Sequence, residues 1–103
     1  PIPEMPVDVP KYVLKRSWLG LDAHVQLPTR VYQQRQQRIL HSMVQAQKQC
    51  GVKLLDPEPI LCHKQVCASS DARGRPYYYD DDHLSVYGAE QLLPLFRTMF
   101  AKP

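Results

Sequence analysis

The clearest pattern of apolar and polar positions lies between residues 29 and 50, and it predicts an amphipathic helix. Apolar side chains recur there at steps of three and four residues, opposite a face of arginines and glutamines. Thr29 is suited to cap the first turn, and Gly51 follows the last one. Such a stripe requires a sheet or a second helix to cover it. Its members are Ile39, Leu40, Met43, Val44 and the segment 46–50.

A buried strand is predicted for residues 52–55, directly after Gly51, with Asp56 and Pro57 ending it. A helix followed by a strand is half of a right-handed crossover unit, which belongs to a parallel α/β sheet. This is the one strand that the pattern predicts firmly, so we expect the parallel sheet to be incomplete within the chain. An exposed strand edge and uncovered apolar faces would then favour self-association of the isolated chain.

The remaining segments complete a single partial domain over residues 1–103, with the order helix, strand, long loop, helix. Residues 1–28 are expected to form an extended, proline-rich lead-in, with a short helix at 11–19 and a loop at 20–28. Residues 56–83 form the long loop, and residues 84–103 the C-terminal helix. Ser85 is suited to cap that helix, and Pro94 should kink or split it. Its expected buried residues are Leu92, Leu93, Phe96 and Phe100.

Composition is that of a soluble globular segment, with 103 residues, a net charge of +3 and no apolar run long enough to span a membrane. Residues 30–48 carry several cations and no acid, but the residues between them are mainly glutamines, without the repeated aromatic residues of a nucleic-acid surface. We therefore interpret this face as solvated surface and expect no nucleic-acid partner. The single tryptophan, Trp18, is expected to pack against the body of the domain.

Two of the three cysteines, Cys62 and Cys67, enclose four residues, a spacing that suits a disulfide across a tight loop. A disulfide would indicate an oxidising compartment. Free thiols remain an alternative, as does a zinc site formed by Cys50, Cys62, His63 and Cys67, although the pair of C-x-x-C motifs usual for zinc is absent. We expect no metal and no cofactor.

The sequence Asp80-Asp81-Asp82-His83 places a carboxylate three residues before an imidazole. A histidine that accepts a proton from a hydroxyl works best when a carboxylate fixes its tautomer and stabilises the imidazolium. Asp80 and His83 are therefore candidates for a catalytic acid and base. Aspartates before a helix are also favoured by the helix dipole, so a purely structural role stays open from the spacing alone.

The acidic loop and its flanks resemble the last conserved block of the SGNH (GDSL-like) esterases and acyltransferases, most closely the version fused to acyltransferase-3 membrane proteins. The resemblance covers residues 52–100 and extends weakly over residues 1–51. It implies a flavodoxin-like three-layer α/β domain of which this chain is the C-terminal part, with Asp80 and His83 as members of a Ser-His-Asp triad. The stretches that carry it are Tyr77 to Ala89, Leu55-Asp56-Pro57, Leu61-Cys62, Cys67 and Gly74-Arg75-Pro76.

The chain departs from the family at the nucleophile. SGNH enzymes take their serine from a Gly-Asp-Ser block and oxyanion donors from a Gly-x-Asn-Asp block. Here none of the four glycines precedes Asp-Ser, and the chain contains no asparagine. We therefore expect the chain alone to be inactive, and the nucleophile and a membrane domain to lie upstream in the same polypeptide.

The function that the resemblance implies is O-acyl transfer, in particular O-acetylation of a cell-envelope polysaccharide. The location would be periplasmic or extracytoplasmic, with a tether to the inner membrane through the upstream region. Two alternatives stay open: a secreted carbohydrate esterase of the same family, and a non-catalytic module for glycan binding or assembly in which Asp80 and His83 are structural.

Overall fold

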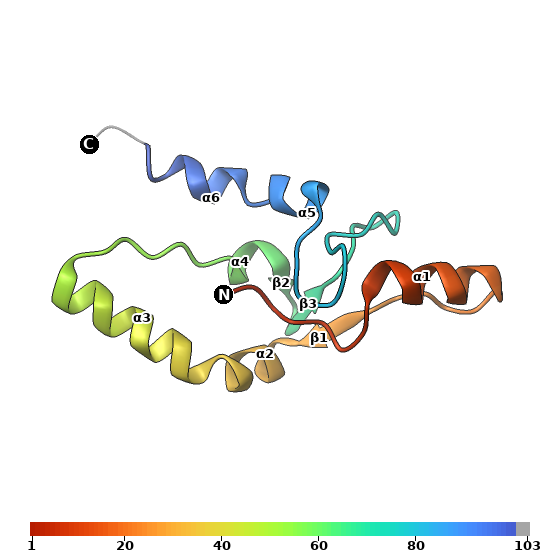
Figure 1. The fold of residues 1–103 in the computed structure, drawn as a ribbon, viewed down its shortest axis with the longest axis horizontal. Helices are drawn as coiled ribbons and strands as arrows, with labels where there is room; N and C mark the ends of the chain where they lie inside the picture. Colours follow the sequence, from red (N-terminus) through yellow and green to blue (C-terminus); the bar gives the residue numbers. More distant parts are fainter. Residues whose placement is uncertain (101–103) are drawn as a thin grey trace.

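A small antiparallel sheet with a bridged hairpin lies at the centre of the fold (Figure 1). The computed structural model describes residues 1–100. Its three strands are β1 (Gln26–Pro28), β2 (Cys62–His63) and β3 (Val66–Ala68), in the order β1-β3-β2. Leu27 of β1 and Cys62 of β2 both lie opposite Cys67 of β3. The fold is therefore a mixture of helices with a three-stranded sheet.

The sheet differs from the expected parallel one, because every described strand pair is antiparallel. The physical reason is the short connection between β2 and β3: the two residues Lys64 and Gln65 can join antiparallel strands, whereas a parallel pair requires a crossover of a dozen residues or more. A second difference is that the loop expected at residues 20–28 contains the strand β1. Pro28 is tolerated in β1 because this is an edge strand, which pairs with a neighbour on one side only.

No strand forms at residues 52–55, which corrects the prediction of a buried strand there. The segment is extended and runs between α3 (Gln37–Cys50) and α6 (Leu93–Arg97) (Figure 1). Lys53 donates a hydrogen bond from Nζ to the Thr98 carbonyl oxygen at 2.6 Å, and Val52 is 44% exposed. A strand exists only through bonds to a neighbouring strand, and no described segment pairs with this one.

The predicted helix at 29–50 is divided at Gln36 into α2 (Thr29–Arg35) and α3. Gly51 ends α3 in the left-handed conformation, with φ of 69°, as expected. Thr29 does not cap α2, because Pro28 occupies the capping position and the Thr29 hydroxyl instead lies 3.7 Å from Cys67 Sγ. The shorter α2 packs on the sheet and buries Tyr32.

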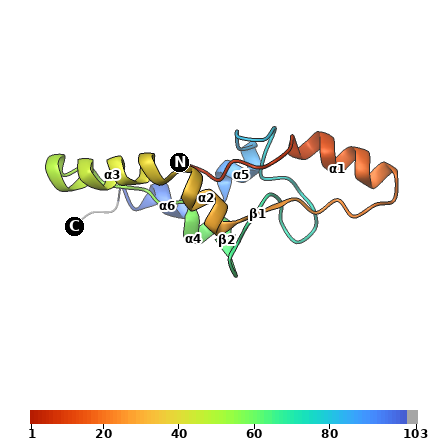
Figure 2. The same cartoon turned by 90° about the horizontal axis from the view of Figure 1, so that it is seen from below.

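The apolar stripe of α3 is covered on one side only: Leu40 and Met43 are half-buried and line a hollow with Leu54 and Leu55, whereas the other side is exposed. None of its residues is buried, and Ile39 and Val44 are 52% and 42% exposed. Figures 1 and 2 both place α3 at one end of the molecule, away from α1 (Val9–Trp18). That side of α3 is therefore open to solvent in the structure.

The core lies where the N-terminal segment crosses the sheet. Helix α1 starts at Val9 because the Asp8 carboxylate accepts a hydrogen bond from the Lys11 backbone N–H at 3.1 Å, and Pro10 is tolerated in its first turn. The core brings together residues from both halves of the chain, so the lead-in is an integral part of the fold. The buried cluster consists of Met5, Val9, Val25, Leu27, Tyr32, Cys67 and Tyr78.

The C-terminal helix is split by Pro94, as predicted, into α5 (Val86–Glu90) and α6. Ser85 caps α5, since its Oγ accepts a hydrogen bond from the Gly88 N–H at 3.0 Å. Of the four residues predicted to be buried in this helix, only Leu92 is buried. The other three are exposed because no described element covers the side of the helix on which they lie. Residues 101–103 of the predicted helix lie outside the described residues. The exposed fractions are 47%, 47% and 82% for Leu93, Phe96 and Phe100.

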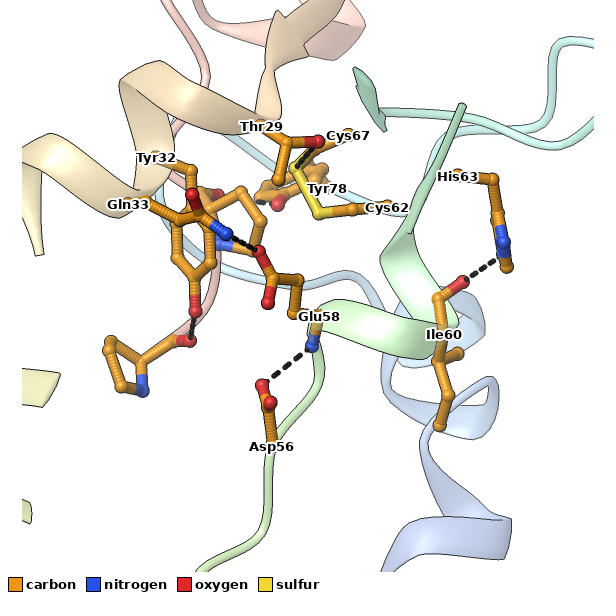
Figure 3. Close-up of a disulfide and its surroundings, with 12 residues drawn as sticks. Thr29, Tyr32, Gln33, Asp56, Glu58, Ile60, Cys62, His63, Cys67 and Tyr78 are labelled. Atoms are coloured by element: carbon orange, nitrogen blue, oxygen red, sulfur yellow. Dashed lines mark hydrogen bonds between the residues drawn. A yellow bond between two sulfur atoms is a disulfide. The ribbon is translucent and has the colours of Figure 1, made fainter. Parts of the chain in front are cut away.

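The long segment 56–83 is more ordered than expected, because it contains α4 (Glu58–Leu61) and the hairpin. Figure 3 shows the disulfide between Cys62 and Cys67, with α2 and α4 on either side. Gln33 of α2 donates a hydrogen bond to Glu58 of α4 at 2.6 Å. The disulfide therefore lies at the junction of the hairpin with two helices.

Replacing both Cys62 and Cys67 by serine is expected to lower the free energy of unfolding by roughly 2 kcal/mol, the chain-entropy value for so short a loop. Urea denaturation of the oxidised chain and of the double variant measures the difference. Cys50→Ser is the matched control and should leave stability unchanged, because Cys50 is exposed and free. Equal midpoints for the double variant and the control would contradict a stabilising role for the disulfide.

Candidate active site

The loop that carries Asp80 and His83 is closed at its base by a short antiparallel contact. Tyr78 and Leu84 form an isolated bridge, and the Tyr79 N–H donates to the His83 carbonyl oxygen at 2.9 Å. Tyr78 is 1% exposed and its hydroxyl donates to the Pro3 carbonyl oxygen. Burial raises the pKa of the Tyr78 phenol, so it remains a neutral hydrogen-bond donor.

The N-terminal segment holds the tip of the same loop. The Met5 N–H donates to the Asp81 carbonyl oxygen at 2.7 Å, and the Val9 N–H donates to that of Asp80 at 3.3 Å. Both donors belong to residues whose side chains are buried in the core. The loop is therefore fixed from two sides by backbone contacts, although its own polar side chains remain accessible.

Asp80 and His83 are in direct contact. The Asp80 Oδ2 atom lies 2.9 Å from His83 Nδ1, and Asp80 Oδ1 accepts the backbone N–H groups of Asp82 and His83 at 2.9 and 2.7 Å. The carboxylate thus has both oxygens engaged and a fixed orientation. Its side chain is 26% exposed and that of His83 is 65% exposed. The structure brings together the two residues that the sequence singled out.

The surroundings of His83 determine which ring nitrogen carries the proton. Asp82 Oδ1 also lies 2.9 Å from Nδ1, so both neighbours of this nitrogen are carboxylate oxygens, which accept hydrogen bonds. In the neutral imidazole the proton is therefore on Nδ1, and Nε2 holds the free lone pair. Within residues 1–100 no hydrogen bond to Nε2 is formed. This is the tautomer that a general base needs when a carboxylate orients it.

The same contacts shift the protonation equilibria of the pair. The hydrogen bond that His83 Nδ1 donates to Asp80 is the main cause that raises the pKa of His83 above 6.5, and the charges of Asp80 and Asp82 add to it. Partial desolvation raises the pKa of Asp80, but the backbone N–H groups of Asp82 and His83 and the imidazole outweigh it, so the pKa falls below its usual value. Asp80 is consequently ionised wherever His83 titrates.

Asp82 has a different environment from Asp80. Desolvation and the charge of Asp81 raise its pKa, and its side chain is 48% exposed. Asp80, Asp82 and His83 offer ligand atoms within 4.8 Å of one another, which is close enough for a divalent cation. The group is exposed and its members already pair with each other, so its geometry is explained without an ion.

Helix α5 packs against the backbone at the base of the loop that carries Asp80 and His83. A Cβ atom on Gly88 would lie 1.9 Å from the Tyr77 carbonyl oxygen, so the helix packs directly on the backbone that precedes Asp80. The Ser85 N–H donates to the same Tyr77 oxygen at 2.8 Å, and the Ser85 hydroxyl donates to the Pro76 oxygen at 3.0 Å. The contacts of Ser85 and Gly88 thus give residues 85–88 a structural role: they hold the backbone that leads into the loop.

A second cluster beside α5 was not anticipated from the sequence. The Tyr87 hydroxyl donates to Asp71 Oδ2 at 2.7 Å, and this bond, followed by the Arg75 backbone N–H, lowers the pKa of Asp71. The Arg75 guanidinium lies 3.9 Å from the centre of the Tyr87 ring. Tyr87 is 16 residues from Asp71 without a recognisable spacing, so only the folded arrangement reveals their contact.

Cys62 and Cys67 lie in the hairpin shown in Figure 3, and Cys50 is at the end of α3. Because Cys62 and Cys67 are joined to each other, their sulfurs cannot be zinc ligands in this state. The His63 Nε2 atom lies 3.0 Å from the Ile60 carbonyl oxygen. A hollow of about 830 Å³ adjoins the disulfide, and neither Asp80 nor His83 lines it.

This chain belongs to the SGNH domain family, of the kind fused to AT3 domains, and the family matches residues 1–98. Neither the curated proteins nor the solved structures that were compared with the chain match it. Among the described residues, none of the helices has the length and apolar character needed to cross a bilayer.

Proposed function

We propose that this chain is the base-bearing part of an SGNH-type O-acyltransferase and supplies the histidine and the aspartate of a Ser-His-Asp triad. The contact of 2.9 Å between Asp80 Oδ2 and His83 Nδ1 carries the proposal, together with the two backbone N–H groups that orient the carboxylate. A structural ion pair needs no particular tautomer, whereas this arrangement leaves Nε2 as the free base.

In the proposed reaction, His83 Nε2 accepts the proton of a serine hydroxyl while the serine oxygen bonds to the acyl carbon of the donor. The imidazolium returns the proton to the leaving group of the donor. An acceptor hydroxyl then loses its proton to Nε2 and attacks the acyl-enzyme, and the serine oxygen takes that proton back. Asp80 stabilises the imidazolium in both steps. Backbone and side-chain donors outside this chain hold the oxyanion.

The serine and the oxyanion donors belong, in this proposal, to an upstream part of the same polypeptide. The exposed side of α3 and the unpaired segment 52–55 support this, because neighbouring strands would cover the first and pair with the second. The parallel, flavodoxin-like layering implied by the family would arise from that association. In isolation the exposed side of α3 is open to a second copy of the chain.

The proposed substrate is a cell-envelope polysaccharide that receives acetyl groups, and the proposed location is extracytoplasmic with a membrane tether. Two observations support this. The family is one whose SGNH domains are fused to AT3 domains. The disulfide between Cys62 and Cys67 indicates an oxidising compartment.

The pH dependence of transfer tests the role of the pair. A protonated imidazole cannot accept a proton, so acyl transfer by the complete polypeptide should rise with pH through the pKa of His83. Because Asp80 raises this pKa, the midpoint should lie above 6.5. In Asp80→Asn the main cause of the shift is removed, and both the rate and the midpoint should fall. Acetyl incorporation into the polysaccharide, measured across pH, provides both quantities.

The control for this measurement is Asp81→Asn, since Asp81 contacts the N-terminal segment through its backbone carbonyl rather than its side chain. It should retain the rate of the unmodified protein. A midpoint that stays unchanged in Asp80→Asn would argue against the proposed orientation of His83. If free acetate were released from the donor and no acetyl group entered the polysaccharide, the reaction would be hydrolysis rather than transfer.

A further inference from the structure

The outward side of α1 carries large apolar side chains that nothing in the described chain covers. Leu14, Trp18 and Leu19 are 70%, 87% and 61% exposed, which corrects the expectation that Trp18 packs against the domain. With Lys11 and Lys15 they line a hollow of about 390 Å³, and we call these five residues the α1 patch. An exposed tryptophan grouped with leucines marks an interaction surface rather than ordinary surface variation.

The charged side chains of α1 itself are all positive. Residues 9–18 contain Lys11, Lys15 and Arg16 and no acidic residue, while Asp8 caps the helix and Asp22 follows it. Arg16 is engaged locally, since its Nε donates to the Asp22 carbonyl oxygen and its guanidinium lies 5.3 Å from the centre of the Tyr12 ring. The two lysines form no ion pair within residues 1–100, and their charges flank the apolar side chains.

The opposite side of α1 fixes the orientation of the patch. Val9 is completely buried, and Tyr12 and Val13 pack against the core, so the helix cannot turn its apolar outer side inward. Figures 1 and 2 show α1 and the chain that returns from it projecting at one end of the molecule, with α3 at the other. The α1 patch is therefore separate from the exposed side of α3.

We propose that the α1 patch lies on the surface of a bilayer that contains anionic lipids. Tryptophan is favoured at the boundary between headgroups and acyl chains, leucines enter the apolar layer, and lysines extend towards anionic headgroups. Charge complementarity selects a lipid surface over an apolar protein partner, because both lysines line the same hollow as the apolar side chains. With ten residues, α1 can lie on a bilayer but cannot cross one.

This contact would also orient the candidate active site. The backbone at the start of α1 is bonded to the loop of Asp80 and His83 through the Val9 N–H. A helix held on the membrane would therefore set the direction and distance of the loop relative to the bilayer. The inference itself does not depend on the proposed activity, since it concerns the affinity of α1 for lipid.

Trp18 is the only tryptophan, so its fluorescence reports on the α1 patch directly. The oxidised chain is mixed with vesicles of phosphatidylcholine and phosphatidylglycerol, and in parallel with vesicles of phosphatidylcholine alone. We expect a blue shift of Trp18 emission and co-sedimentation with the anionic vesicles, both reduced by added salt. Leu14→Asp should abolish the binding, and the double change Lys11→Glu with Lys15→Glu should weaken it severalfold or more.

Ile39→Asp is the matched control, because it places the same charge on the other exposed apolar face and should bind as the unmodified chain does. Near-ultraviolet circular dichroism verifies that each variant remains folded. Equal affinity for neutral and anionic vesicles, or equal loss in Leu14→Asp and Ile39→Asp, would overturn the proposal. A blue shift that depends on protein concentration without vesicles would instead assign the patch to a second copy and would also overturn it.

Discussion

His83→Ala is expected to lower acyl transfer by the complete polypeptide by on the order of 10²–10⁴-fold, the range for loss of a positioned general base. The reason is the tautomer that the structure defines: Asp80 and Asp82 hold the proton on Nδ1, and Nε2 remains to accept another. No other imidazole takes part in this hydrogen-bonded group. The acetyl content of the purified polysaccharide, or transfer to it in vitro, gives the measurement.

The matched control is His63→Ala, because His63 is exposed and its ring contacts only the Ile60 carbonyl oxygen among its described hydrogen bonds. It should retain nearly all of the activity. Stability of both variants should stay close to that of the unmodified protein, since both side chains are exposed. If the two variants retained equal activity, His83 would not be the base.

Gly88→Ala is expected to cost about 3 kcal/mol of unfolding free energy, at the upper end of the range for overpacking. The new Cβ would lie 1.9 Å from the Tyr77 carbonyl oxygen and 2.7 Å from its carbonyl carbon, and neither backbone atom can move without displacing the loop of Asp80 and His83. The urea midpoint of the chain measures the loss. Activity of the complete polypeptide should fall with it, because Tyr77 leads into that loop.

Gly51→Ala separates this steric effect from a conformational one. Gly51 has φ of 69°, but nothing lies within 4 Å of an added Cβ. Its replacement should therefore cost about 1 kcal/mol, as for a non-glycine residue in the left-handed region. If Gly88→Ala proved no more destabilising than Gly51→Ala, α5 would not pack against Tyr77 as described.

Features that depend on neighbouring residues could be predicted from the sequence. The hydroxyl of Ser85, the left-handed Gly51 and the missing N–H of Pro94 act within one helical turn, and each ends or begins a helix where expected. The Asp80 and His83 contact is of the same kind, since three residues of loop suffice to bring the side chains together. The contact at the candidate site could therefore be predicted from the sequence, while its catalytic role stays a prediction.

Features that depend on distant partners could not be predicted in the same way. The segment 52–55 has the composition of a buried strand, yet a strand requires a neighbour to accept and donate its backbone bonds. Phe96 and Phe100 have apolar side chains suited to a core, but no described element covers that side of α6. The type of a side chain shows whether it favours burial, whereas its actual burial depends on whether another element of the fold covers it.

The hairpin was missed for a different reason. Its turn residues Lys64 and Gln65 both have positive φ, at 52° and 70°, a conformation normally signalled by asparagine or glycine. Neither residue gives that signal. Strands of two or three residues are also too short to show a period of two. The disulfide between Cys62 and Cys67 joins residues directly opposite each other, and it helps to hold a turn that its own residues do not favour.

The central claim is that His83 activates a serine supplied by another part of the same polypeptide. Labelling of the complete polypeptide with a fluorophosphonate, which reacts with activated serines, tests this most directly. The account predicts one labelled serine in the unmodified protein, equal labelling in His63→Ala and loss of labelling in His83→Ala. Undiminished labelling of that serine in His83→Ala would contradict it.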